Sequence, residues 1–101
     1  MNTEVVYIAG KMRGLPDYGR ANFDEAARQL SELGYIVLNP AMLPVGMADT
    51  AYMPICLAMV DAADCVYMID GWQESEGARI EYHYAVCQHK RILSGNITES
   101  R

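Results

Sequence analysis

The sequence predicts an α/β fold in which about four parallel strands form one sheet with helices on both faces. Three observations lead to this prediction. Short runs of β-branched and aromatic residues alternate with longer segments whose apolar residues recur at helical spacing. Glycine, proline or asparagine separates many of these segments. The strand-like runs are joined by helical segments, and this alternation is typical of parallel strands with right-handed crossovers.

The expected strands are short, uninterrupted apolar runs. Such runs are typical of strands that are buried on both faces of a sheet. For four parallel strands the flavodoxin-like order 2-1-3-4 is expected, in a single three-layer domain. The expected strands are Glu4–Ala9, Tyr35–Leu38, Cys65–Ile69 and Arg91–Leu93.

Helices are expected between these strands. The apolar residues of Phe23–Leu33 recur at helical spacing, and Gly34 follows where a C-cap belongs. Ala51–Ala63 is predicted as the second helix with Thr50 as its N-cap, and Gly77–Lys90 as the third. The remaining segments are predicted as loops: Lys11–Gly19, Asn39–Thr50 and Asp70–Glu76.

Length, composition and charge limit the class of protein. The 101 residues predict one domain over residues 1–95, followed by a short polar tail at 96–101. No apolar run approaches the about 18 residues of a membrane span, and no signal peptide precedes the first strand, so a cytoplasmic protein without membrane contact is expected. A net charge of −5 argues against nucleic acid as a partner.

The cysteines and histidines do not form a metal-binding pattern. Cys56, Cys65 and Cys87 are odd in number and contain no CxxC spacing, so they are predicted to be buried free thiols. His83 and His89 are too far apart to form a metal pair on one helix face. We therefore expect neither a metal nor any other cofactor.

Ligands of parallel α/β sheets bind at the carboxyl ends of the strands, which directs attention to the loops after the first and third strands. Small residues in the first loop allow a ligand to approach the backbone, and its two cations complement a phosphate or carboxylate. A solvated turn is the alternative interpretation. This loop opens with Gly10, Lys11, Met12, Arg13 and Gly14.

The loop after the third strand combines acids with a helix start. Ser75 or Gly77 would direct backbone N–H groups of that helix at an anion. Glu81 follows one turn later, and a carboxylate there can stabilise or attack an electron-poor carbon, as in glycosidic cleavage. Trp72 is expected either to stack on a base or to cover the apolar edge of the sheet. A solvated acidic loop with a surface glutamate is the alternative.

Three stretches together resemble one family. Residues 7–16, 38–40 and 71–81 look like the DUF4406 family, small proteins common in phages and prophages and of unassigned biochemical function. The resemblance covers roughly residues 5–93. DUF4406 proteins are similar in turn to nucleoside 2-deoxyribosyltransferases and to 2′-deoxynucleoside 5′-monophosphate N-glycosidases.

This resemblance implies roles for individual residues. The nucleophilic glutamate of the enzymes falls on Glu81, with Gly77 as the glycine four positions before it. A tyrosine near the nucleophile matches Tyr7, and both side chains are expected within a few ångströms of each other. Arg13-Gly14 and Ser75 match positions of the monophosphate hydrolases, which implies a nucleotide 5′-phosphate held by these residues and by the nearby lysine.

One position departs from the enzymes. Where they carry an aspartate in the middle helix, this chain has Cys56, and a thiol with a pKa of about 8.5 does not replace a carboxyl acid. Either Asp70 or Glu74 substitutes for the missing acid, or the base is handled differently, or the site binds without turnover.

The implied function is an N-glycosidase or N-deoxyribosyltransferase acting on a deoxynucleoside 5′-monophosphate. The alternatives are a non-catalytic nucleotide-binding protein, such as a phage modulator, and a glycohydrolase of NAD or cyclic ADP-ribose. The expected partner is a small-molecule nucleotide or nucleoside. A homo-oligomer is also expected, because the third helix is apolar on more than one side, at Tyr82, Tyr84, Val86 and Cys87.

Overall fold

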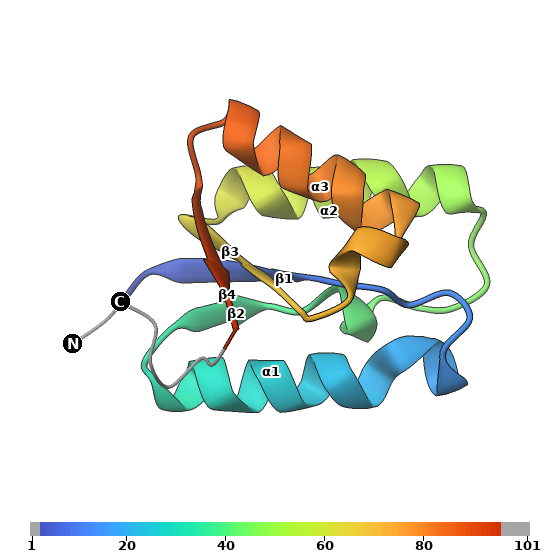
Figure 1. Ribbon diagram of the computed structural model, residues 1–101, viewed down its shortest axis with the longest axis horizontal. Helices are drawn as coiled ribbons and strands as arrows, with labels where there is room; N and C mark the ends of the chain where they lie inside the picture. The colour runs from blue at the N-terminus through green and yellow to red at the C-terminus, as the bar shows by residue number, and fades with distance from the viewer. Residues whose placement is uncertain (1–2, 96–101) are drawn as a thin grey trace.

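Four parallel strands form one sheet in the order β2-β1-β3-β4, which confirms the predicted topology. The computed structural model describes residues 3–95, so the tail expected at 96–101 lies outside the described residues. The loops after β1 and β2 leave the sheet toward the right of Figure 1. The strands are β1 (Val5–Ala9), β2 (Ile36–Leu38), β3 (Cys65–Met68) and β4 (Arg91–Ser94).

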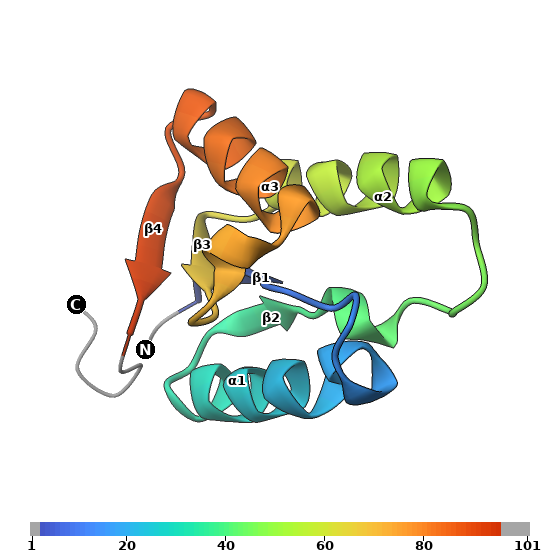
Figure 2. The same cartoon turned by 45° about the vertical axis from the view of Figure 1, so that its right-hand side comes forward.

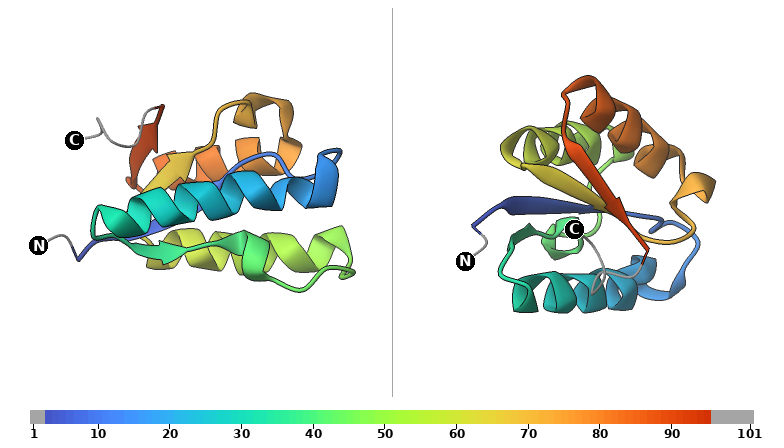
Figure 3. Two further views of the ribbon diagram at one scale, coloured as in Figure 1. Left: turned by 90° about the horizontal axis from the view of Figure 1, so that it is seen from below. Right: turned by 60° about the vertical axis from the view of Figure 1, so that its left-hand side comes forward.

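Helices cover both faces of the sheet, as predicted. One helix, α1 (Arg20–Glu32), lies alone on one side, whereas α2 (Asp49–Ala62) and α3 (Glu76–Cys87) lie together on the other (Figures 2 and 3). Short 3-10 turns follow β1, β2 and β3. They are η1 (Pro16–Gly19), η2 (Pro40–Met42) and η3 (Trp72–Glu74).

The central strand β1 divides the core into two layers. Val6 and Ile8 pack on the α1 side with Phe23 and Leu30, because successive side chains of a strand point to opposite faces. Tyr7 and Ala9 therefore face α2 and α3. Tyr7 is aligned with Leu38 of β2 and with Val66 of β3, so it lies in the middle of the sheet. This register brings a tyrosine into the layer beneath α2 and α3.

The helix ends follow the predictions in part. At the end of α1, Gly34 has a φ of 96° and donates to Ser31 while Tyr35 donates to Leu30, which confirms the predicted glycine cap. The prediction of Thr50 as the N-cap of α2 is wrong, because the helix begins at Asp49 and its N-cap is Ala48. The helix start has no side-chain capping hydrogen bond, and the charge of Asp49 in the first turn complements the helix dipole.

The third helix ends earlier than predicted. It stops at Cys87, and His89 adopts a left-handed φ of 61° that turns the chain toward β4. Of the three cysteines, Cys56 and Cys65 are buried as predicted, but Cys87 is exposed in the last turn of α3, so the prediction for it is wrong.

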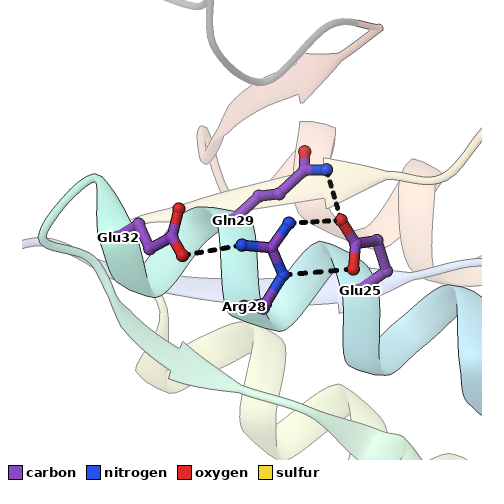
Figure 4. Close-up of polar contacts among 4 residues, drawn as sticks. All are labelled: Glu25, Arg28, Gln29 and Glu32. Carbon is purple, nitrogen blue, oxygen red and sulfur yellow. Dashed lines mark hydrogen bonds and ion pairs between the residues drawn. The ribbon is translucent and has the colours of Figure 1, made fainter.

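The outer face of α1 is exposed to solvent and carries charged side chains. Figure 4 shows Arg28 between Glu25 and Glu32, with guanidinium–carboxylate distances of 2.6 Å to each. Gln29 donates to Glu25 at 2.7 Å. Neighbours three and four residues apart on a helix make such pairs, and exposed pairs add little stability. Within residues 3–95, no helix combines the length and apolarity that crossing a membrane requires.

Candidate active site

A cleft of about 450 Å³ opens at the carboxyl ends of the strands. Both loops singled out from the sequence line it, together with the first turns of α2 and α3. The two segments predicted to hold an anion therefore converge on one cavity. The lining includes Tyr7, Gly10, Lys11, Met12, Arg13, Asp49, Met53, Cys56, Glu74, Ser75, Glu76, Gly77 and Glu81.

Tyr7 and Glu81 meet where the cleft enters the core. The Tyr7 hydroxyl donates to Oε2 of Glu81 at 3.0 Å, although the residues are 74 positions apart. Tyr7 is 0% exposed and Glu81 is 7% exposed. Glu81 lies on the same inward face of α3 as the buried Ala78 and Ala85, so its carboxylate occupies a core position. The predicted proximity of the two side chains is confirmed.

Burial determines the protonation of this pair. It raises the pKa of Glu81 to about 7, while hydrogen bonds with Tyr7 and Cys56 act in the opposite direction. Burial and the neighbouring Glu81 charge hold the pKa of Tyr7 well above its usual range. Burial also raises the pKa of the Cys56 thiol. At neutral pH, Tyr7 and Cys56 are therefore neutral beside a carboxyl group that titrates.

The start of α3 forms one wall of the cleft. The Ser75 hydroxyl accepts a hydrogen bond from the backbone N–H of Ala78 at 3.1 Å and so caps the helix. This hydroxyl keeps its own O–H as a donor. A Cβ atom at Gly77 would come no closer than 3.7 Å to Met53, so a glycine is not required there for space. The wall combines a hydroxyl with the positive end of a helix dipole.

Both cations of the first loop contact acids across the cleft. Lys11 Nζ lies 3.2 Å from Glu74 in η3. Arg13 forms an ion pair with Asp49, the first residue of α2. The loop is thereby tied to η3 on one side and to α2 on the other. Gly10 allows the start of this loop to pass close to Ile69, because a Cβ atom at this position would lie only 3.0 Å from the Ile69 side chain.

Three of the predicted site residues do not line the cleft. Asp70 is exposed in the turn after β3. Burial, and after it the Asp70 charge, raises the pKa of Tyr67 on the α1 side of the sheet. Trp72 stacks on Tyr82 of α3, with ring centroids 4.7 Å apart. Gly14 is exposed beside the cleft, with a φ of 87°. Of the two acids that the sequence offers as replacements for the aspartate missing from the middle helix, only Glu74 lines the cleft.

Sequence reasoning did not single out Asp49 or Met53. Both belong to the first turns of α2, which line the cleft beside Cys56. In a parallel α/β sheet every crossover helix begins at the carboxyl edge of the strands. That rule would have directed attention to the start of α2 as well as to the two loops.

A second hollow of about 510 Å³ adjoins the cleft. The side chains of Met12, Arg13, Asp49 and Cys56 line both cavities. The hollow is otherwise bounded by η1, the start of α1, η2 and the segment between η2 and α2. In that segment the Pro44 carbonyl accepts a hydrogen bond from the Tyr52 hydroxyl at 2.5 Å. Among residues 3–95, no group of three His, Cys, Asp or Glu side chains could hold a metal ion.

Comparison with known proteins identifies the fold and the family. The fold is similar to that of a solved structure described as a 2-desoxiribosyltransferase from Leishmania mexicana, with a TM-score of 0.72 and 21% sequence identity. The similarity covers 90% of this chain, which spans 63% of the other. No curated protein matches the sequence. The family model of DUF4406, a domain of unknown function, matches residues 4–94, and the chain belongs to that family.

Proposed function

We propose that this protein cleaves the bond between base and sugar of a deoxynucleoside 5′-monophosphate, as an N-glycosidase or an N-deoxyribosyltransferase. The observation that carries the proposal is the buried pair of Tyr7 and Glu81 in a cleft of about 450 Å³. Small-molecule sites commonly enclose about 300–1,000 Å³. The fold shared with a 2-desoxiribosyltransferase supports the same class of reaction.

Glu81 is the proposed nucleophile. Its carboxylate forms a bond to C1′ of the sugar while the bond from C1′ to the base nitrogen breaks. The base leaves with that electron pair and takes a proton from water. Water then attacks C1′ and releases Glu81 in a hydrolase, whereas a second base does so in a transferase. The burial of Glu81 strengthens its attraction for the positive charge that develops on the sugar.

Tyr7 is the proposed positioning residue for this nucleophile. Its hydroxyl holds Oε2 of the carboxylate at 3.0 Å and so fixes the orientation of Glu81 where it lines the cleft. Because the pKa of Tyr7 lies well above its usual range, the hydroxyl stays a hydrogen-bond donor throughout the working pH range. A donor to a carboxylate stabilises the ionised form, which is the reactive one.

The phosphate group is assigned to the cleft wall. Arg13 and Ser75 line the cleft from opposite loops, and Lys11 lies beside them. Arginine makes bidentate hydrogen bonds to phosphate, and the first N–H groups of α3 add donors near Ser75.

Release of free base tests the proposal. The protein is incubated with deoxynucleoside 5′-monophosphates, the matched nucleosides and NAD, and free base is measured by chromatography. We expect release from a monophosphate and its loss in Glu81→Gln. The matched control is Glu32→Gln on the outer face of α1, which should keep the activity. No release from any compound, or release that survives Glu81→Gln, would contradict the proposal.

Binding without turnover is the second candidate function. The observation that favours it is Cys56, a neutral thiol at the cleft where the related enzymes carry an acid. In that case the monophosphate binds to the cleft and no base is released, in the wild type as in Glu81→Gln. The same panel distinguishes the two functions when calorimetry is measured beside chromatography.

A further inference from the structure

The cations that face the cleft are balanced by acids of the rim. Lys11 contacts Glu74 and Arg13 contacts Asp49, and Glu76 adds a further negative charge to the lining. A phosphate that enters this cleft therefore meets cations that already have carboxylate partners. The affinity for phosphate depends on how readily those partners are replaced.

We infer that Asp49 is the counter-ion that a substrate phosphate replaces on Arg13, and that Asp49 thereby sets the affinity of the cleft for the phosphate group. The inference rests on the proposed function, because it takes the ligand to be a nucleotide. It adds a residue that the sequence did not single out and assigns it a role in phosphate selection.

The position of the ion pair supports the exchange. Arg13 comes from the loop after β1 and Asp49 from the first turn of α2, and both residues line the cleft and the adjoining hollow. The pair thus stands between the two cavities. The Arg13 side chain is 77% exposed and that of Asp49 is 68% exposed, so water reaches both partners. Exposed ion pairs of this kind are weak and open readily.

A dianionic phosphate has the advantage over this carboxylate. It accepts a bidentate pair of hydrogen bonds from Arg13, and it can accept others from Ser75 and the start of α3 at the same time. Asp49 competes with the phosphate for Arg13, and its charge also repels the phosphate. A nucleoside without phosphate leaves the ion pair intact. Asp49 therefore affects the affinity for monophosphates and has little effect on nucleosides.

Calorimetric titration with deoxynucleoside 5′-monophosphates and with the matched nucleosides tests the exchange. Asp49→Asn keeps the shape of the side chain and removes its charge. We expect it to bind the monophosphate about two- to fivefold more tightly than the wild type, and to bind the nucleoside equally well. Glu76→Gln is the matched control, because it removes the same charge from the same cleft, and Glu76 acts on Arg13 through its charge alone, without the hydrogen bond that Asp49 accepts. Its gain in affinity should be smaller.

The double variant identifies the partner of Asp49. If the gain arises from freeing Arg13, then Arg13→Ala with Asp49→Asn binds the monophosphate as Arg13→Ala alone does. Melting curves of each variant show that it is folded. Equal gains in Asp49→Asn and Glu76→Gln, a gain that persists without Arg13, or no monophosphate binding at all would overturn the inference.

The experiments distinguish a failure of this inference from a failure of the proposed function. Binding that responds to Asp49→Asn as expected, with no release of base, supports the exchange and contradicts the enzyme. Base release lost in Glu81→Gln, with monophosphate affinity unchanged in Asp49→Asn, supports the enzyme and overturns the exchange.

Discussion

Tyr7 in β1 and Glu81 in α3 are joined by a 3.0 Å hydrogen bond inside the core, between residues 74 positions apart. The neighbours of Glu81 on the inward face of its helix are alanines, so an apolar residue would pack at this position more favourably than a carboxyl group. Buried carboxyl groups with strongly shifted pKa values are typical of functional sites. The following predictions use this pair and the loops around it.

Replacing Glu81 changes how stability depends on pH. The pKa of Glu81 is about 7 in the folded protein and 4.5 ordinarily, so the folded state binds more protons between these values. Its contribution to stability is present below about pH 4.5 and is lost as pH rises through 7, a fall on the order of 3 kcal/mol. We expect the unfolding free energy of Glu81→Gln, measured with urea, to lack this fall. An identical pH dependence in both proteins would contradict the assigned pKa.

The rate of base release should follow the ionisation of Glu81. The nucleophile reacts as a carboxylate, so kcat/KM is expected to rise with pH and to level off above the pKa of about 7. Tyr7→Phe removes a hydrogen bond that favours the ionised form, and should move this limb of the profile upward by about one pH unit. A profile that keeps its midpoint in Tyr7→Phe would show that the hydroxyl does not tune Glu81.

Arg13 should distinguish nucleotides from nucleosides. We expect a deoxynucleoside monophosphate to raise the melting temperature more than its nucleoside does, and Arg13→Ala to remove most of the difference. The loss of one charged hydrogen-bond partner typically costs about 1.5–3 kcal/mol. Arg28→Ala on the outer face of α1 removes another paired arginine and should keep the difference. Equal shifts for both ligands in the wild type would mean that the loop is only a turn.

Two glycines of the first loop offer a matched test of its packing. Gly14 and Gly19 have left-handed φ values of 87° and 71°, which penalise alanine at both positions. A Cβ atom at Gly19 would also lie 2.9 Å from the Lys11 carbonyl oxygen, whereas nothing lies within 4 Å of one at Gly14. We expect Gly19→Ala to lower the unfolding free energy by about 1–3 kcal/mol more than Gly14→Ala. Equal losses in a denaturant titration would contradict this account of the turn.

Strand order, the layers and the glycine cap of α1 were predictable because each depends on local pattern and chain connectivity. Buried apolar runs, helical spacing and right-handed crossovers leave few topologies. The same rules placed the loops after β1 and β3 at one edge, and the resemblance to known enzymes paired Tyr7 with Glu81. The start of α2 and the end of α3 were less predictable, because Ala48 is the N-cap of α2 and His89 takes a left-handed position where glycine is usual.

Tertiary packing alone decides the partners and the protonation of the site. Composition suggested two available cations in the first loop, yet Lys11 and Arg13 are each paired with an acid from a different element. Asp70 also follows the carboxyl end of a strand, β3, but it does not line the cleft. The pKa of Glu81 depends on how much water the surrounding elements exclude. These properties arise from distances between segments far apart in the chain, and no local pattern encodes such distances.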